Sequence, residues 1–518
     1  MQAYGMQSQF MNGPNPAATQ RTGSEQFFGF LFLILAGACA VLSFFAPLKP
    51  DALYISVVLG SVSLTLSLLL VAKSMQPKPI NWITADVLFA TSFSLVHFAY
   101  FFYWVLGATG KSRELWYMGH YPFSHTVCVG LAMYAAAVNC FLAGYYLVQT
   151  RRWIAVINEQ PPSKTVRARW GQLGRLLVRL GCAGFCAFIA IVGPAKFFGA
   201  YSGTNNISFV ANIFFQIGQV MLMAGMAVSM AAKQRLVATK KRKSRFSLGI
   251  SFLDAILVGG LLFAIGIHGD RSTLLYLVGA FAVAYSEYVK PPKAKTLVLA
   301  ALVLVFFLGF ILAFRSAKTD TYDFDPLNNI NAALQNIGTS SVCGFVAIAN
   351  TEAEGHTYGW MQIKQLAGIV PFGRRLFGIG DSIDNSSAMK LTHLIQGKVG
   401  SGVAGTGSSV FADYYFDFGL YGTMILFIAA GFLAKRVQNR ARTSTSILWQ
   451  VVLVTLVAFL AVCSRYTLTS GLIRTVLYSS IYTWFIFFAF GAPTRYRRRS
   501  RVQNRQFGML PSPGHRSP

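Results

Sequence analysis

The chain has 518 residues, of which 54% are hydrophobic and only 12% are charged. Soluble globular proteins carry about twice that share of charged residues, so the composition excludes a soluble enzyme or a soluble binding domain. The formal net charge of +28 would suit a nucleic-acid partner, and only the distribution of Lys and Arg along the chain can decide that question. The composition predicts an integral membrane protein.

Apolar runs of about 18 to 25 residues, each long enough to cross the hydrocarbon core as a helix, recur throughout the chain. We predict about twelve transmembrane helices, and hence an all-α polytopic membrane protein with one long, partly helical loop outside the membrane. The predicted helices start near Gln26, Ala52, Trp82, Phe123, Leu176, Ile207, Ser247, Ser272, Thr296, Gly419, Ile447 and Gly471.

These helices divide the chain into consecutive parts. We expect a disordered cytosolic tail at 1–25, helices one to nine at 26–314, the large loop at 315–418, helices ten to twelve at 419–491, and a basic cytosolic tail at 492–518. The first of these parts is rich in Gln, Asn, Pro and Gly and has neither the basic region nor the cleavage site of a signal peptide.

Connections between predicted helices that are rich in Lys and Arg alternate with connections that contain few of them. If the N-terminus is cytosolic, the short outer connections hold only Lys49, Lys111, Arg113, Lys196, Arg271 and Arg465. Such a bias is the positive-inside rule, which places both termini in the cytosol. The basic segment at 240–245 is then an anchor that touches anionic lipid, and we predict no nucleic-acid partner.

The seven cysteines are scattered, and all but Cys343 fall within predicted transmembrane helices. They form no disulfide framework and no Cys/His spacing typical of a zinc site. The glycine-rich stretch at 400–409 lacks the preceding strand and the Lys of a phosphate-binding loop. We predict no metal and no other cofactor.

The loop at 315–418 is much longer than any other outer connection, and loops of this length are usually functional. Its stretch MQIKQLAGIV has the apolar spacing of a helix. We expect the loop to lie against the membrane as short helices and to cover polar groups at the outer ends of the transmembrane helices.

Three arginines are predicted at that outer level. The stretch GIHGDRSTLLY at 266–276 interrupts two apolar runs with a short polar turn that carries Arg271, and Arg465 and Arg474 lie at the ends of the last two helices. Arginine near the hydrocarbon usually faces protein or a water-filled cavity, and its guanidinium binds phosphate with paired hydrogen bonds. We predict an anion site, to which the loop adds Arg374 and Arg375. Snorkelling of Arg465 and pairing of Arg271 with Asp270 alone are the structural alternatives.

Three motifs resemble the Wzy-type O-antigen polymerases of bacterial inner membranes, which are related to the O-antigen ligases. The turn with Arg271 resembles the family's Gly-x-Arg turn, and EGHTYGWMQIKQLAGIVP at 354–371 is similar to its loop segment. GSSVFADYYFDFGLYG at 407–422 resembles the family's Glu-x-Tyr-x-x-Phe-Gly-x-x-Gly entry to the next helix, with Asp413 in the place of Glu. The resemblance covers roughly the half of the chain from Ser247 to Trp484.

The resemblance implies a glycosyltransferase that lengthens a polysaccharide at the periplasmic face of the inner membrane. A growing glycan would move from undecaprenyl pyrophosphate to the non-reducing-end sugar of another lipid-linked oligosaccharide, so that donor and acceptor are both lipid-linked. A chain-length regulator and a flippase of the same pathway are the implied protein partners. The arginines would stabilise the pyrophosphate leaving group without a metal.

The acceptor hydroxyl must lose a proton, and two residues are candidates for the general base. His356 belongs to the loop, and histidine titrates near neutrality. Asp413 lies at the membrane end of the loop, where it could also be an ion-pair partner of the arginines. His268, Glu352 and Glu354 are weaker candidates.

Two other functions remain open from the sequence. An O-antigen ligase, which attaches the polymer to the lipid A core, would share layout and chemistry with a polymerase. A transporter or flippase would need inverted repeats and ionisable residues near the bilayer midplane. Asp86 and Asp254 lie within predicted helices, but close to cytosolic helix starts, where we expect them to be solvated and structural.

Overall fold

The computed structural model describes residues 16–76, 79–107, 124–148, 163–198, 208–233, 250–268, 270–300, 303, 326–370, 373–380, 385–396, 407–444 and 446–494. Most of the two predicted tails, the basic segment at 240–245 and most of the ninth predicted helix lie outside these residues. The side chain of Arg271 also lies outside the description.

All secondary-structure elements of the described chain are helices, and none is a strand. Its helices are α1 (Pro16–Phe44), α2 (Ala52–Ser74), α3 (Ala85–Val105), η2 (Ser124–Thr126), α4 (Val127–Leu147), α5 (Lys164–Val192), α6 (Pro194–Phe197), α7 (Phe209–Lys233), α9 (Phe252–His268), α10 (Arg271–Tyr288), α12 (Pro326–Glu354), α13 (Trp360–Ala367), α14 (Gly373–Leu376), α15 (Ser387–Gln396), α16 (Val410–Thr443), α17 (Ile447–Leu460), η7 (Cys463–Arg465), η8 (Leu468–Leu472) and α18 (Ile473–Ala489).

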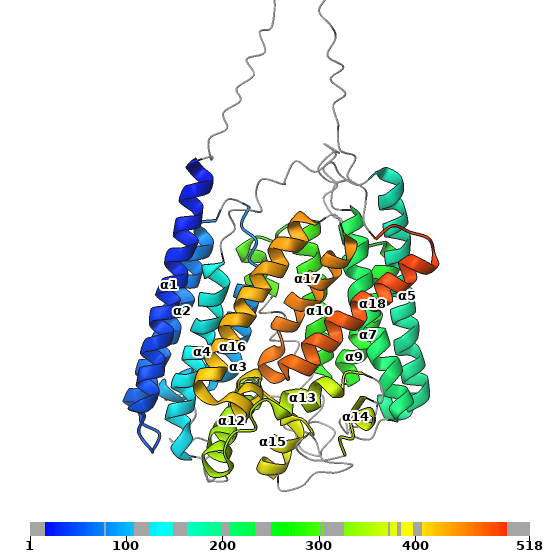
Figure 1. The fold of residues 1–518 in the computed structure, drawn as a ribbon. Helices are drawn as coiled ribbons and strands as arrows, with labels where there is room; N and C mark the ends of the chain where they lie inside the picture. Colours follow the sequence, from blue (N-terminus) through cyan, green and yellow to red (C-terminus); the bar gives the residue numbers. More distant parts are fainter. Residues whose placement is uncertain are drawn as a thin grey trace, which may run out of the picture.

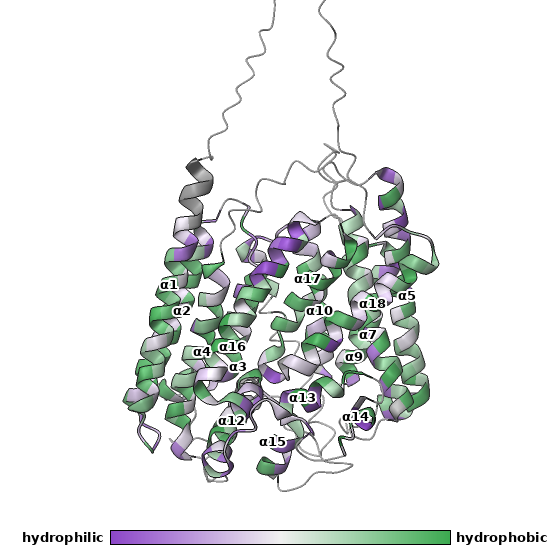
Figure 2. Cartoon of the chain, in the orientation of Figure 1, coloured by the Kyte–Doolittle hydropathy of each residue, from purple (hydrophilic) through white to green (hydrophobic). Residues whose placement is uncertain are grey.

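The prediction of an all-α polytopic membrane protein is confirmed. In the part of the chain that the structure describes, 8 helices are long and apolar enough to cross a membrane, and α9 and α17 are shorter apolar helices. Every predicted transmembrane helix except the ninth coincides with a described helix, the eighth being α10. In Figure 2, hydrophobic colours cover most of these helices, whereas hydrophilic residues gather at the C-terminal end of α16.

Helix α4 is the most deeply buried of the candidate membrane-spanning helices and packs against α1 and α16. Small residues allow these helices to approach closely. A Cβ atom added to Gly144 of α4 would lie 2.0 Å from the carbonyl oxygen of Ile428 in α16, so only glycine fits there. The close contact fixes α16, which carries the residues of the candidate site at its N-terminal end.

The long loop forms helices α12 to α15, which lie together at one end of the bundle, at the bottom of Figure 1. The helix expected from MQIKQLAGIV is α13. Helices α13 to α15 are short, as expected, but α12 has 29 residues and packs with its C-terminal half against α3 and α4. The N-terminal end of α1 and the basic C-terminal end of α16 lie at the opposite end of the bundle.

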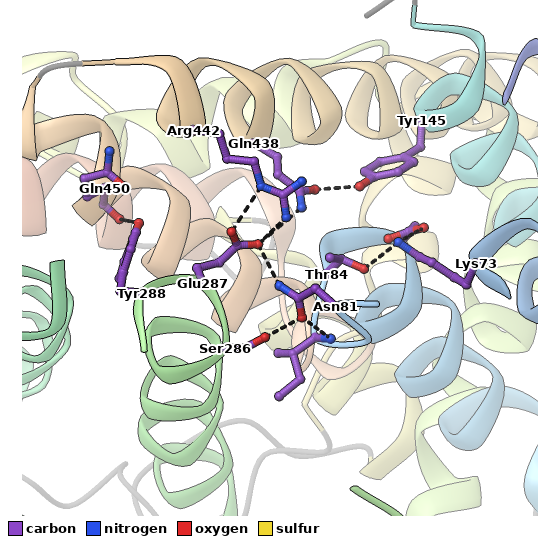
Figure 3. Close-up of polar contacts among 12 residues, drawn as sticks. Lys73, Asn81, Thr84, Tyr145, Ser286, Glu287, Tyr288, Gln438, Arg442 and Gln450 are labelled. Carbon is purple, nitrogen blue, oxygen red and sulfur yellow. Dashed lines mark hydrogen bonds and ion pairs between the residues drawn. The ribbon is translucent and has the colours of Figure 1, made fainter. Parts of the chain in front are cut away.

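A partly buried polar cluster holds the helices together at that opposite end (Figure 3). Glu287 of α10 accepts hydrogen bonds from Arg442 of α16 and from Asn81, and Gln438 of α16 accepts one from Tyr145 of α4. The carboxylate of Glu287 thereby links α10 to α16 and to the segment that precedes α3.

The expectation that Asp86 and Asp254 are solvated is wrong, because both side chains are buried. Asp86 accepts hydrogen bonds from Tyr146 at 2.7 Å and pairs with the buried Lys73 at 2.9 Å. Asp254 pairs with Arg179 at 3.2 Å. A buried carboxylate needs such partners, and the neighbouring helices supply them.

Candidate functional site

The long loop closes onto the first turns of α16 through Asp417. The buried carboxylate of Asp417 accepts hydrogen bonds from the backbone N–H groups of Gly359 at 3.1 Å, Met361 at 3.2 Å and Gln362 at 3.0 Å. The hydroxyl of Thr357 donates a further bond. The N–H groups in the first turn of a helix lack partners within the helix and favour a negative charge. Asp417 therefore binds the N-terminus of α13 to α16.

His356 lies against a kink in α16. The kink is at Gly419, whose φ of 61° and ψ of −161° are not helical. A Cβ atom added to Gly419 would lie 2.7 Å from Nε2 and 2.9 Å from Cε1 of His356. The imidazole is half-buried, packs edge-on against Tyr415, and has a buried Nδ1 without a hydrogen-bond partner among the described residues. One ring nitrogen therefore has no hydrogen bond to the described part of the protein.

Asp413 is completely buried and joins three helices. Its carboxylate accepts hydrogen bonds from the side-chain amide of Gln365 in α13 and from the hydroxyl of Ser387 in α15, the latter at 2.8 Å. The amide of Gln362 donates to the main-chain carbonyl of Asp413 at 3.0 Å. No described arginine forms an ion pair with Asp413, whose second carboxylate oxygen is buried and unpartnered there. The residue thus holds α13 and α15 on α16.

Arg474, in the first turn of α18, lies among tyrosines. It is half-buried and within electrostatic range of the phenols of Tyr276, Tyr466 and Tyr478. The hydroxyl of Tyr276 is buried and has the hydroxyl of Thr475, which donates to the carbonyl of Gly471 at 2.8 Å, as its polar neighbour, without a well-formed hydrogen bond between the two. The hydroxyl of Tyr478 donates to the carbonyl of Ile369, just after α13. No ion pair to Arg474 occurs within the described chain. A guanidinium without a counter-ion and several phenols therefore occupy one region beneath the loop.

The other two predicted arginines lie on segments next to this cluster. Arg465 ends η7 with an exposed side chain and directly precedes Tyr466. Arg271 begins α10, and at the rise of an α-helix its main chain is about 8 Å along the axis from Tyr276. The three arginine-bearing segments thus meet at the loop end of the bundle.

The short turn before α10 is held by Asp270. Its carboxylate accepts hydrogen bonds from the hydroxyl of Ser272 at 2.8 Å and from the backbone N–H of Thr273 at 3.2 Å. Asp270 is therefore the N-cap of α10. The polar turn predicted between the two apolar runs therefore also has a structural role, because its Asp270 caps α10.

Arg374 and Arg375 lie on α14 and have different environments. Arg374 donates from Nη2 to the carbonyl of Asn385 at 3.5 Å, and its guanidinium packs over Gly368. Its Nε is buried without a partner among the described residues. Arg375 is exposed. Arg374 therefore connects the chain after α13 with the start of α15, while Arg375 is free to reach solvent or lipid.

The weaker candidates for a base are bound elsewhere. Nδ1 of His268 bonds to the carbonyl of Phe197 at 2.6 Å, and the two rings stack with centroids 4.2 Å apart. Glu352 pairs with His125 at 3.4 Å on the surface. Both residues stabilise contacts between helices.

Glu354 ends α12 and pairs with Lys390 of α15 at 3.0 Å. The hydrogen bond from Lys390, and a second one from Asn350, hold the pKa of Glu354 below its usual value. A carboxylate with a lowered pKa stays ionised at neutral pH and is poorly suited to accept a proton.

Comparison with known proteins identifies the family. The chain matches the family model described as O-antigen polysaccharide polymerase Wzy over residues 26–495. The chain belongs to this family. Its members polymerise O-antigen repeat units, act on lipid-linked oligosaccharides, and reside in bacterial membranes. No curated protein and no solved structure matches the chain.

The site of this chain contains two residues, Asp417 and Tyr276, that were not predicted from the sequence. Asp417 stands in the DYYFDFG stretch four residues after Asp413, and Tyr276 ends the stretch that contains Arg271. The spacing of four places Asp413 and Asp417 on one face of a helix, which was a usable signal. Nothing in the sequence indicated that Tyr276 would come within electrostatic range of Arg474, because the two residues belong to different helices, α10 and α18.

The described residues contain no group of three or more His, Cys, Asp or Glu side chains that could hold a metal ion. The polar groups that meet at the loop end are guanidinium, phenol and imidazole groups, together with two carboxylates that are hydrogen-bonded within the protein. Such a set is suited to binding an anion and to moving a proton.

Proposed function

We propose that the chain extends O-antigen by transferring a growing glycan from undecaprenyl pyrophosphate to the non-reducing-end sugar of a second lipid-linked repeat unit. The observation that carries this proposal is Arg474, which is half-buried, lies within electrostatic range of the phenols of Tyr276, Tyr466 and Tyr478, and has no carboxylate partner among the described residues. A cation without a counter-ion at membrane depth is costly unless a ligand supplies the negative charge.

In this proposal the pyrophosphate of the donor lies between Arg474, Arg271 and Arg465. Arginine binds phosphate with paired hydrogen bonds, and charge increases on the leaving pyrophosphate as the reaction proceeds. Donors already in place stabilise that charge most effectively. Arg374 and Arg375 of α14 would act at the rim, Arg374 mainly by shaping the loop.

His356 is the proposed general base. The acceptor hydroxyl oxygen forms a bond to the anomeric carbon of the donor sugar, and the bond between that carbon and the pyrophosphate oxygen breaks. The electron pair leaves with the pyrophosphate, the hydroxyl proton passes to His356, and water then removes it. His356 is half-exposed, whereas Asp413 is closed off by α13 and α15, so we assign Asp413 the role of positioning the loop.

We further propose that the loop at 315–418, with α12 to α15, lies in the periplasm and that both tails are cytosolic, in a protein of the inner membrane. The uneven distribution of Lys and Arg supports this orientation. The basic C-terminal end of α16 and the loop helices at opposite ends of the bundle are compatible with it. A chain-length regulator and a flippase would then act on the same lipid-linked units.

The test is a gel of surface polysaccharide from cells that lack the protein and receive wild type, Arg271→Ala or Arg474→Ala. We expect a ladder with wild type and single repeat units on the lipid core with either variant. Arg436→Ala is the matched control, because Arg436 is exposed at the other end of α16. Wild-type ladders from both site variants, at normal protein levels, would disprove the anion site.

The same gel separates the alternatives. If cells without the protein lacked every repeat unit on the core and accumulated lipid-linked polymer at the outer face, the protein would be a ligase. Lipid-linked units retained at the inner face would indicate a flippase. The family match favours polymerisation over both.

A further inference from the structure

Helix α13 exposes three large apolar residues and buries both of its glutamines together with Met361. Trp360 and Ile363 are 52% and 51% exposed, and Leu366 continues the same face, whereas Gln362 and Gln365 are only 8% and 1% exposed. An amphipathic helix on a water-facing surface shows the opposite arrangement. The exposed face of α13 is therefore unlike a surface that meets water.

The orientation of α13 is fixed from within the protein. Gln365 donates its amide to the carboxylate of Asp413, and Gln362 donates to the main chain of the same residue. Asp417 holds the helix N-terminus. Since these bonds require the glutamines to face inward, the apolar side of α13 must face outward.

The exposed apolar surface continues beyond α13. Val370, Leu376 and Phe377 extend it, the last two with 76% and 72% of their surface exposed. At the other end, Phe418 of α16 would be 3.4 Å from a Cβ atom on Gly359, directly before α13. The surface is therefore continuous with α16.

Helices α16 and α18 expose apolar side chains of their own, as transmembrane helices do where they meet lipid. The residues are Tyr421 and Ile425 on α16, and Ile473, Leu477 and Ile481 on α18. Helix α13 packs against α16 and η8 and is bound by Tyr478 of α18 through Ile369. Its apolar face thus joins two lipid-facing surfaces.

We infer that α13 and α14 lie in the membrane leaflet on the loop side of the bundle, with the face of Trp360, Ile363, Leu366 and Val370 buried in bilayer lipid. The half-buried Lys364, whose ammonium lies 6.0 Å from the Trp360 ring centroid, would extend to the lipid phosphates. The inference goes beyond the proposed function, because it concerns the lipid contact of the loop and holds whichever residue is the base.

The test uses full-length protein in nanodiscs, with Cys186→Ser to remove the only exposed cysteine. A bimane label is placed on Ile363→Cys, and its fluorescence is quenched either by brominated phosphatidylcholine or by aqueous iodide. Ile425→Cys is the lipid-facing reference, and Ala353→Cys, exposed between two glutamates at the end of α12, is the water-facing reference.

We expect brominated lipid to quench label 363 as strongly as label 425, with bromine near the headgroup more effective than bromine near the chain end. Leu366→Cys gives a second position on the same face, in case the first variant folds poorly. Quenching of the labels at 363 and 366 by iodide alone would overturn the inference, since this face of α13 would then meet water. Protection from both quenchers would also overturn it, because protein would then cover the face.

Discussion

The carboxylate of Asp417 accepts a hydrogen bond from the backbone N–H of Gln362 at 3.0 Å and thereby caps the loop helix α13 from the first turns of α16. The same segment of α16 bears the kink at Gly419 on which His356 rests. His356, the proposed base, is consequently positioned by the contact between the loop and the start of α16, which are two separate motifs in the sequence.

Replacing Asp417 should release α13. In Asp417→Ala, the N–H groups of the α13 N-terminus lose their acceptor, at a cost of about 1–3 kcal/mol for each buried group left unpaired. Asp417→Asn keeps one oxygen acceptor and should have an intermediate effect. We expect shorter polysaccharide ladders and faster protease cleavage at 355–359 in purified protein, in the order Ala, Asn, wild type.

Asp51→Asn is the control for this series. Asp51 is the exposed N-cap of α2, and Asn is an equally good cap, so the ladder and the cleavage rate should stay as in wild type. If Asp417→Ala made long ladders and resisted the protease, the carboxylate would not be what holds the loop.

The kink of α16 should tolerate no side chain. Gly419→Ala brings a Cβ atom to within 3 Å of the His356 ring and forces a positive φ on alanine. Such backbone strain costs on the order of 1–3 kcal/mol, and the imidazole must move. We expect loss of polymerisation at nearly normal protein levels, measured by the ladder and by immunoblotting of membranes.

Gly60→Ala tests whether glycine loss alone matters. A Cβ atom on Gly60 would have no neighbour within 4 Å, and its φ is not positive. Alanine there should be neutral or slightly stabilising. A wild-type ladder from Gly419→Ala would mean that the position of His356 is irrelevant to the reaction.

Sequence patterns predicted the helices well because hydrophobic length is a strong and local signal. The motif with Asp413 was placed at the entry to α16, but its carboxylate was expected near the arginines. The structure instead turns it toward Gln365 and Ser387. The direction of a buried side chain depends on partners from α13 and α15, which no local pattern contains.

The hydroxyl of Tyr276 should serve binding and contribute nothing to folding. It is buried within electrostatic range of Arg474, and its polar neighbour Thr475 already donates to the carbonyl of Gly471, so Tyr276→Phe should change stability little. If the hydroxyl binds the pyrophosphate, the variant should show a KM for lipid-linked substrate raised about 10-fold, the effect of a hydrogen bond to a charged group. Thermal unfolding in detergent and polymerisation assays at varied substrate measure the two effects.

Tyr288→Phe provides the matched comparison on the same helix. The hydroxyl of Tyr288 donates to the carbonyl of Gln450 at 3.5 Å, at the end of α10 away from the loop. Its removal loses this additional hydrogen bond to a carbonyl within α17 and should lower the unfolding temperature slightly without raising KM. A lower unfolding temperature and an unchanged KM in Tyr276→Phe would assign that hydroxyl to folding.

The buried pair of Lys73 and Asp86 should matter for stability and not for chemistry. Asp86→Ala leaves the ammonium of Lys73 buried without its counter-ion, and removal of one partner from a buried ion pair costs roughly 3–5 kcal/mol. Removing both charges, in Lys73→Met with Asp86→Leu, should restore much of this loss, because hydrophobic residues of similar volume often replace a buried pair without penalty. Thermal unfolding of the single and double variants measures the coupling. Because the pair lies at the end of the bundle opposite α13, each folded variant should keep the wild-type KM; a raised KM in the well-folded double variant would show instead that this end of the bundle communicates with the site.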